Sequence, residues 1–232
     1  MADLHSSSST DDPQAALDQT LGLLRAHDDT SKFVGLSLLR SLLDSNARFR
    51  TNTDVILRCW NAISNKFLVR LLTSHSTKKK GVEEVKSMVQ LALAVVHLFA
   101  NLLPPSETAQ EKMTEFCAPL VHAIPRLDAE PQALAFQTLQ CIASSPTGAK
   151  ALSSVQDWNP LLEAAKENPE QYLKQVARLF AVSQQSCKMT EYTLDEWHSR
   201  LEVFIRLLHE KDKSALIVVL AELAAEFSVS HS

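Results

Sequence analysis

Residues 82–103 read VEEVKSMVQLALAVVHLFANLL, and this stretch decides the predicted fold. At about 100° per residue, one narrow stripe of a helix collects most of its polar side chains. From Val85 onward almost every position outside the stripe is apolar. The pattern predicts a long helix that is buried on most sides and shows water one thin stripe. The stripe consists of Glu83, Lys86, Gln90, Ala94, His97 and Asn101.

The uncharged run from Ser87 to Ser106 has the length of a membrane-spanning helix. However, Gln90, His97 and Asn101 interrupt it, and the pair Pro104-Pro105 ends it. We therefore interpret the run as a buried helix of a soluble protein, and we expect no direct membrane insertion.

The rest of the chain repeats the helical pattern, and no segment alternates as a strand would. Pro13, Pro131, Pro160 and Pro169 suit the first turn of a helix, where the missing N–H costs little. The pattern predicts about ten helices with short connections. They cover residues 13–24, 30–43, 55–72 (bent or paired), 82–103, 107–117, 119–127, 131–144 and 148–154. Two further helices start at Pro160 and Pro169. The last two cover residues 194–209, with Thr193 as the cap, and residues 213–227.

Groups of two or three helices recur at about 40 residues, a period typical of armadillo and HEAT repeats. The sequence therefore predicts an all-α, right-handed solenoid of the armadillo/HEAT kind, formed by one domain over residues 13–228. Residues 1–12 are polar and rich in serine, and we expect them to form a disordered tail.

Composition argues against several functional classes. The glycines are too scattered to form a phosphate-binding loop, in which the backbone must approach the ligand closely. The net charge is −4, and the lysine run 78–80 is interpreted as the polarity of a solvated loop, so we expect no nucleic-acid partner. The four glycines are Gly22, Gly35, Gly81 and Gly148.

The cysteines also lack the spacing of a functional site. Cys59, Cys117, Cys141 and Cys187 show no CxxC pair, and they sit among apolar residues. They are expected to be reduced, mostly buried packing residues of a cytoplasmic protein. Asp195 and His198 share a helix face but supply only two of the four ligands of a structural zinc site. The sequence thus predicts no catalytic residue, no metal site and no cofactor, and a protein that is not an enzyme.

Several blocks of this sequence resemble the neurochondrin family. Asp28–Leu39 is similar to the family's opening helices, and Phe67–Leu72 follows a helix with Trp and Ile as the family pattern does. Thr138–Ala143 then leads into the break Ser145–Gly148, with Leu152 after it. The order and spacing of the blocks match over residues 15–180 and more loosely to the end.

The resemblance implies an armadillo-like cytosolic scaffold without catalytic residues. Family chains are usually much longer, so the resemblance also implies that this chain corresponds to an N-terminal portion. Some animal members carry cysteines at the extreme N-terminus that suit lipid attachment. Residues 1–12 contain no cysteine, so anchoring by that route is not expected here.

The polar stripe of residues 82–103 is the candidate partner-binding surface. Lys86, Gln90, His97 and Asn101 would face the concave groove of a solenoid, where amides can pair with the backbone of an extended peptide. The alternative is that the stripe faces the convex surface or a loop and binds nothing.

The run Ala215–Ala221 suggests a second surface, because a helix with this sequence is apolar all round. Solenoids normally end in a repeat with a polar outer face, whereas Leu216, Ile217, Val219 and Leu220 form an apolar one. We expect part of this face to be exposed until further repeats, a second copy or a partner covers it. Self-association through the last helix is one of these outcomes.

Together these features predict a non-enzymatic scaffold that binds partner proteins on a solenoid surface. The alternative is a structural subunit of a larger assembly that has no peptide groove of its own. A pool of exchangeable partners is expected of the first, and a fixed complex of the second.

Overall fold

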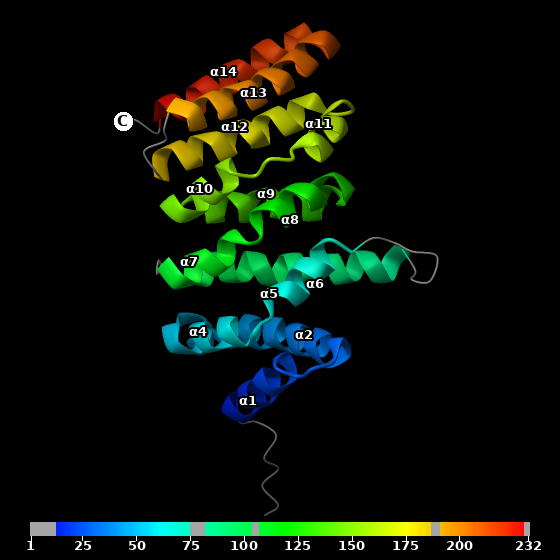
Figure 1. The fold of residues 1–232 in the computed structure, drawn as a ribbon, viewed down its shortest axis with the longest axis vertical. Helices are drawn as coiled ribbons and strands as arrows, with labels where there is room; N and C mark the ends of the chain where they lie inside the picture. The colour runs from blue at the N-terminus through cyan, green and yellow to red at the C-terminus, as the bar shows by residue number, and fades with distance from the viewer. Residues whose placement is uncertain (1–12, 75–81, 104–106, 187–190, 230–232) are drawn as a thin grey trace, which may run out of the picture. The chain divides into compact units, whose positions relative to one another are not determined.

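A computed structural model describes residues 13–74, 82–103, 107–186 and 191–229 of the chain. These ranges contain the helices α1 to α14 and one short 3-10 helix, η1, and no strand. The all-α prediction is confirmed, but the helices outnumber the ten that were predicted (Figure 1). Residues 47–51 form a helix where a connection was expected, and the predicted helix 55–72 is divided in two at residues 63 and 64. The predicted tail 1–12 and the lysine run 78–80 lie outside the described residues.

The chain falls into two compact units, with the division between Phe67 and Leu68, where a single domain over residues 13–228 was expected. In the N-terminal unit, α1 packs against α2, and α3 joins α2 to α4. Its elements are α1 (Pro13–Leu24), α2 (Asp29–Ser45), α3 (Ala47–Thr51), α4 (Thr53–Ala62) and the beginning of α5 (Asn65–Leu72).

Side-chain caps set the helix starts in this unit. The Asp28 side chain accepts a hydrogen bond from the Ser31 N–H at 2.7 Å. α2 therefore begins at Asp29, one residue earlier than the pattern predicted. Asn46 and Asn52 cap α3 and α4 in the same way, because an Asn side chain satisfies an N–H that has no partner within the helix. The connection between the predicted helices 30–43 and 55–72 therefore contains a five-residue helix.

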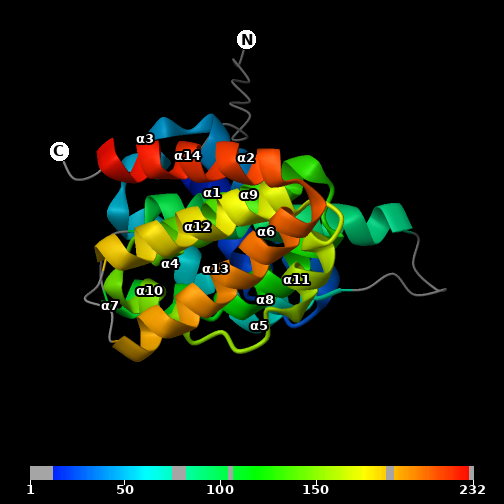
Figure 2. The ribbon, with the colours of Figure 1, turned by 90° about the horizontal axis from the view of Figure 1, so that it is seen from above.

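The C-terminal unit consists of two layers of helices. The long helices α6, α9, α12 and α14 form one row, in which each member packs on the next (Figures 1 and 2). Shorter helices and α13 pack against this row. The elements are α6 (Val82–Leu102), α7 (Glu107–Thr114), α8 (Cys117–Ala123), η1 (Ile124–Arg126), α9 (Ala129–Ala143), α10 (Pro146–Ser153), α11 (Asn159–Ala165), α12 (Pro169–Ser186), α13 (Glu191–Lys211) and α14 (Lys213–Val229).

α6 contributes several fully buried side chains to the core of this unit. Leu93, Val95, Val96 and Phe99 have no exposed surface in the fold. Among the described helices, α6 is also the one whose length and composition would allow it to cross a membrane. A single helix of this kind is weak evidence for a membrane span, because a buried core helix has the same composition.

An arginine between two tryptophans attaches α13 to the connection between α10 and α11. Trp197 has no exposed surface, and its ring lies 5.5 Å from that of Trp158. The Arg200 guanidinium lies 4.9 Å from the Trp158 ring and donates to the carbonyls of Ser153 and Val155, both at 3.0 Å. Partial burial lowers the pKa of Arg200, and the aromatic faces and the two carbonyls offset part of the cost of burying its charge.

The predicted cap of α13 is wrong. The helix begins at Glu191, so Thr193 lies inside its first turn and not at its cap. Threonine is favoured at N-caps but is also tolerated within a helix, so its presence alone does not set a boundary.

We expect Gly148→Ala to destabilise the C-terminal unit. A Cβ at Gly148 would lie 1.9 Å from the Ile142 carbonyl oxygen, and the Ser145 cap holds the backbone there. Forced overpacking of this kind costs about 1–3 kcal/mol of unfolding free energy, or more. Gly22→Ala is the control, because its Cβ would meet nothing within 4 Å; it should raise stability by about 0.5–1 kcal/mol. Urea unfolding followed by circular dichroism measures both, and an unchanged Gly148→Ala midpoint would contradict the close approach.

Candidate functional site

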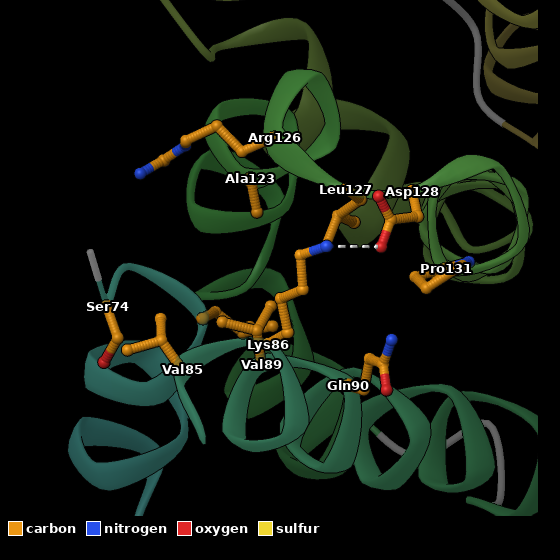
Figure 3. Close-up of a pocket in the computed structure, with 11 residues that line it drawn as sticks. Ser74, Val85, Lys86, Val89, Gln90, Ala123, Arg126, Leu127, Asp128 and Pro131 are labelled. Atoms are coloured by element: carbon orange, nitrogen blue, oxygen red, sulfur yellow. Dashed lines mark ion pairs between the residues drawn. The ribbon is translucent and has the colours of Figure 1, made fainter. Parts of the chain in front are cut away.

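A pocket of about 260 Å³ opens in the C-terminal unit between the end of α5, the first half of α6 and the connection from α8 to α9 (Figure 3). Apolar side chains form most of its wall, and five polar residues stand around them. The apolar residues are Leu72, Val85, Val89, Ala123, Leu127 and Pro131, and the polar ones are Ser74, Lys86, Gln90, Arg126 and Asp128.

Lys86 spans the pocket from α6 to the beginning of α9 (Figure 3). Its Nζ lies 3.2 Å from the Asp128 carboxylate and 4.0 Å from that of Glu83. The hydrogen bond and the charge of Asp128, with a smaller contribution from Glu83, raise the pKa of Lys86. Asp128 precedes α9 but makes no side-chain cap bond, so its carboxylate is available to Lys86. The lysine charge is therefore balanced by carboxylates at the solvent-exposed edge of the pocket, while its aliphatic stem borders the pocket.

The second cation of the pocket is turned away from this ion pair. Arg126 donates from Nε and Nη2 to the His122 carbonyl, at 3.2 and 2.8 Å. In Figure 3 its guanidinium points away from Asp128. Partial burial lowers the pKa of Arg126. The two cations thus do not converge on one point, and the arrangement is not that of an anion site.

Gln90 stands at the pocket with an unused amide. Its side chain is exposed, and in Figure 3 it points toward Pro131 on α9. Within the described part of the chain, the Gln90 amide makes no hydrogen bond. One donor group and one acceptor group are therefore open to a ligand at the mouth of the pocket.

Further along α6, a chain of hydrogen bonds joins the helix to α9. The Thr138 hydroxyl donates to the Leu134 carbonyl at 2.7 Å, so we assign Nδ1–H of His97 as the donor to Thr138 Oγ1 at 3.0 Å. The Asn101 side-chain amide can then donate to His97 Nε2 at 3.3 Å, and the Cys141 thiol donates to the side-chain oxygen of Asn101, Oδ1, at 3.5 Å. Burial lowers the pKa of His97, in keeping with a neutral ring.

Amide side chains continue from α6 across α9 to α12. Asn101 meets Cys141 on α9, and Gln140 beside it donates to Gln175 on α12 at 3.3 Å. Gln137 and Gln171 lie one helical turn before Cys141 and Gln175 and therefore on the same side of their helices. We call the amide row the set Gln90, Asn101, Gln137, Gln140, Gln171 and Gln175, all of which are exposed or half-buried.

The four predicted partner-binding residues do not form one cluster. Lys86 and Gln90 line the pocket, whereas His97 and Asn101 belong to the hydrogen-bond chain with α9. Sequence reasoning missed the α9 side of the pocket and the amides of α9 and α12. Glutamines on separate helices carry no common motif, so only the packing of those helices reveals them as one row.

The predicted apolar face on α14 is exposed only in part. Leu216 and Val219 are buried, because positions 216, 219 and 223 form the stripe that faces the rest of the unit. They do not belong to an exposed face. Ile217 is 69% exposed and Leu220 is 42% exposed, and the neighbouring Val218, at 55%, joins them.

Ion pairs hold the edge of α14 against α12. Lys174 lies 2.8 Å from Glu222, and Arg178 lies 2.6 Å from Glu226. Both glutamates of α14 are thus neutralised at its edge. Ile217 and Leu220 lie on another side of the helix, whereas Val218 lies one turn before Glu222 and borders these pairs.

The cysteines of the described ranges are free thiols. Burial raises the pKa of Cys59 to about 11 and that of Cys117 to about 12, and it also raises the pKa of the half-buried Cys141. Cys187 lies outside the described residues. No group of three or more His, Cys, Asp or Glu side chains placed to hold a metal occurs in the part of the chain that the structure describes.

These raised pKa values predict slow alkylation at pH 8. A thiol with a pKa of about 11 is ionised in about one molecule per thousand at that pH, and only the thiolate reacts. In a Cys187→Ser background, iodoacetamide should modify Cys141 first and Cys59 and Cys117 far more slowly, with rates that rise as the pH rises. Mass spectrometry over time measures the order. Rapid modification of Cys59 or Cys117 would show an activated thiol instead.

Known proteins show what this chain is similar to. The model of the Neurochondrin family matches residues 11–230. An uncharacterized protein of Schizosaccharomyces pombe is 43% identical over 58 residues, which cover 25% of this chain and 10% of that protein. No solved structure matches the chain. Because the family model covers nearly all of the sequence, the chain belongs to the neurochondrin family.

Proposed function

We propose that this protein is a non-enzymatic interaction scaffold that binds an extended segment of a partner protein along the amide row of its C-terminal unit. The observation that carries the proposal is the row itself, which runs over α6, α9 and α12. Asn101, Gln140 and Gln171 already bond to neighbouring side chains, whereas the amides of Gln90 and Gln137 make no hydrogen bond within the described residues. A free amide has both donors and acceptors, and the backbone of an extended peptide has unpaired groups of both kinds. A neutral amide surface therefore suits a peptide better than a polyanion.

A repeat of about 40 residues supports a solenoid of the armadillo/HEAT kind. Most hydrogen bonds between α6 and α9 and between α9 and α12 join residues at a similar spacing, whereas Gln140 and Gln175 are 35 residues apart. His97 and Thr138 are 41 residues apart, Asn101 and Cys141 are 40 apart, and Gln132 and Tyr172 are 40 apart. We infer that α6, α9 and α12 are equivalent helices of successive repeats, and that their shared side is the concave surface.

The same proposal places the protein in the cytoplasm with protein partners. The free thiols favour a reducing compartment, and the net charge of −4 disfavours nucleic acid. The raised thiol pKa values and the family membership support a protein that is not an enzyme and needs no cofactor. We propose no direct membrane insertion, because the apolar side chains of α6 are taken up by the core.

The exposed face of α14 favours a second candidate function, that of a structural subunit in an assembly. Ile217, Val218 and Leu220 are exposed within one helical turn. Glu222 and Glu226 are neutralised by α12, so two such faces can meet without repulsion between these carboxylates. This candidate commits to a second copy of the chain as the occupant of the face.

For the scaffold, we expect Gln90→Ala with Gln137→Ala to weaken peptide binding. A peptide selected from a display library on the wild-type protein serves as the ligand, and calorimetry gives its Kd. Two lost hydrogen bonds cost about 1–3 kcal/mol together, which raises the Kd about fivefold to hundredfold. The melting temperature should stay unchanged, because both side chains are exposed.

The matched control is Gln156→Ala with Gln184→Ala, which removes two exposed amides outside the amide row. It should leave the Kd of the same peptide unchanged. If both double variants weaken the peptide equally, or if neither does, the peptide does not lie on the amide row and the proposed surface is wrong.

For the assembly, we expect Ile217→Glu to abolish self-association while leaving the fold intact. The side chain is 69% exposed, so a carboxylate there stays hydrated in the monomer but would be buried in a dimer. Light scattering over a concentration series should show the wild-type mass rising and the variant staying monomeric. Ser199→Glu, which adds the same charge on an exposed position of α13, should behave like the wild type. A wild-type protein that stays monomeric throughout rejects this candidate.

A further inference from the structure

We propose that the pocket between α6 and the start of α9 is an anchor site for one uncharged, apolar side chain of the bound segment, such as leucine. Gln90 would pair with the backbone of the segment beside that side chain. The inference rests on the proposed scaffold function and names the chemistry that one position of the partner must have.

The size of the pocket fits a side chain. Its volume is about 260 Å³, and its wall is formed mainly by Val85, Val89, Leu127 and other apolar groups. An apolar cavity of about 150 Å³ is enough to hold benzene. Pockets for cofactors and drug-sized ligands begin at about 300 Å³, so this one suits a single side chain better than a whole small molecule.

The charges around the pocket decide which kind of side chain can enter it. Lys86 is the cation that reaches across the pocket, and its ammonium already meets Asp128 at 3.2 Å and Glu83 at 4.0 Å. The guanidinium of Arg126 is directed to the His122 carbonyl and away from Asp128. A carboxylate or an ammonium that entered would lose hydration without gaining a free counter-ion. An uncharged apolar side chain loses no hydrogen bonds to water when it enters the pocket. It also covers apolar wall of the pocket that is otherwise in contact with water.

The position of Gln90 links the pocket to the amide row. This residue lines the pocket and also belongs to the amide row, and its amide is unused within the described residues. A segment whose side chain enters the pocket therefore passes its backbone over Gln90 and can continue toward Gln137 on α9. Anchoring one side chain in a pocket while amides hold the adjacent backbone is a common way to bind an extended peptide.

The test uses four capped peptides of the form acetyl-Gly-Ser-X-Ser-Gly-amide, with X as Leu, Ala, Glu or Lys. Methyl groups of Val, Leu and Ile are labelled in the whole chain, and each peptide is titrated by NMR. We expect the Leu peptide to shift the methyl signals of Val85, Val89 and Leu127, and to bind at least about tenfold more tightly than the others. Shifts of equal size with the Glu or Lys peptide, or shifts confined to methyls elsewhere, would overturn the proposal.

Two pairs of variants test the pocket and its charge balance. Leu127→Asp should weaken the Leu peptide about tenfold or more, whereas Leu91→Asp, on α6 but outside the pocket, should leave it unchanged. Lys86→Met keeps an aliphatic stem but releases Asp128, so the Lys peptide should now bind. Asp128→Asn releases Lys86, so the Glu peptide should now bind. Unchanged preferences in both of these variants would refute the role of charge balance.

The display-selected peptide separates failure of the pocket from failure of the scaffold. If the amide-row variants weaken that peptide but Leu127→Asp does not, the anchor site is wrong and the scaffold proposal stands. If the amide-row variants have no effect on it, the scaffold surface itself is wrong. If Leu127→Asp weakens it and its apolar residue cannot be replaced by Glu or Lys, both proposals hold.

Discussion

The packing of α6 against α9 is the interaction on which the C-terminal unit depends. α6 is too apolar to remain in water, so most of its surface must be covered by other helices. Its remaining polar edge is used at the interface: Lys86 pairs with Asp128, and His97 and Asn101 bond to Thr138 and Cys141. These polar contacts are directional, and therefore they hold the two helices in one register where apolar packing alone would allow several.

The same arrangement is repeated toward the C-terminus. Gln132 on α9 receives the Gln171 amide at 2.8 Å and donates to the Tyr172 hydroxyl at 2.9 Å, which joins α9 to α12. Lys174 and Arg178 then join α12 to α14. Apolar side chains supply the burial between the helices, and two or more polar contacts or ion pairs per helix pair align them. A row built in this way leaves its polar residues along one side, which is where a partner segment could find hydrogen-bond donors and acceptors.

The pocket arises from an interruption in this regular packing. η1 and the turn at Leu127 and Asp128 separate α8 from α9, and the beginning of α9 does not close over Val85 and Val89. The Lys86–Asp128 pair bridges the opening, so the charges near it are satisfied while its wall stays apolar. The opening therefore combines an apolar wall with charges that already have partners, and this combination is the basis of the proposed anchor site.

Much of this protein could be predicted from its sequence, since local rules determine helices. The stripe of α6, the apolar position of Trp197 and the prolines at helix starts all follow from periodicity and backbone geometry. The caps at Asp28, Asn46 and Asn52 and the early start of α13 depend on contacts too local or too weak to read reliably from pattern. On α14, a run that is apolar all round could not show which face is buried. Ile217 and Val219 look alike in sequence, and only the packing of the unit exposes the first and buries the second. The pocket and the amide row belong wholly to tertiary structure, because each combines residues about 40 positions apart, whose proximity depends on how successive helices stack.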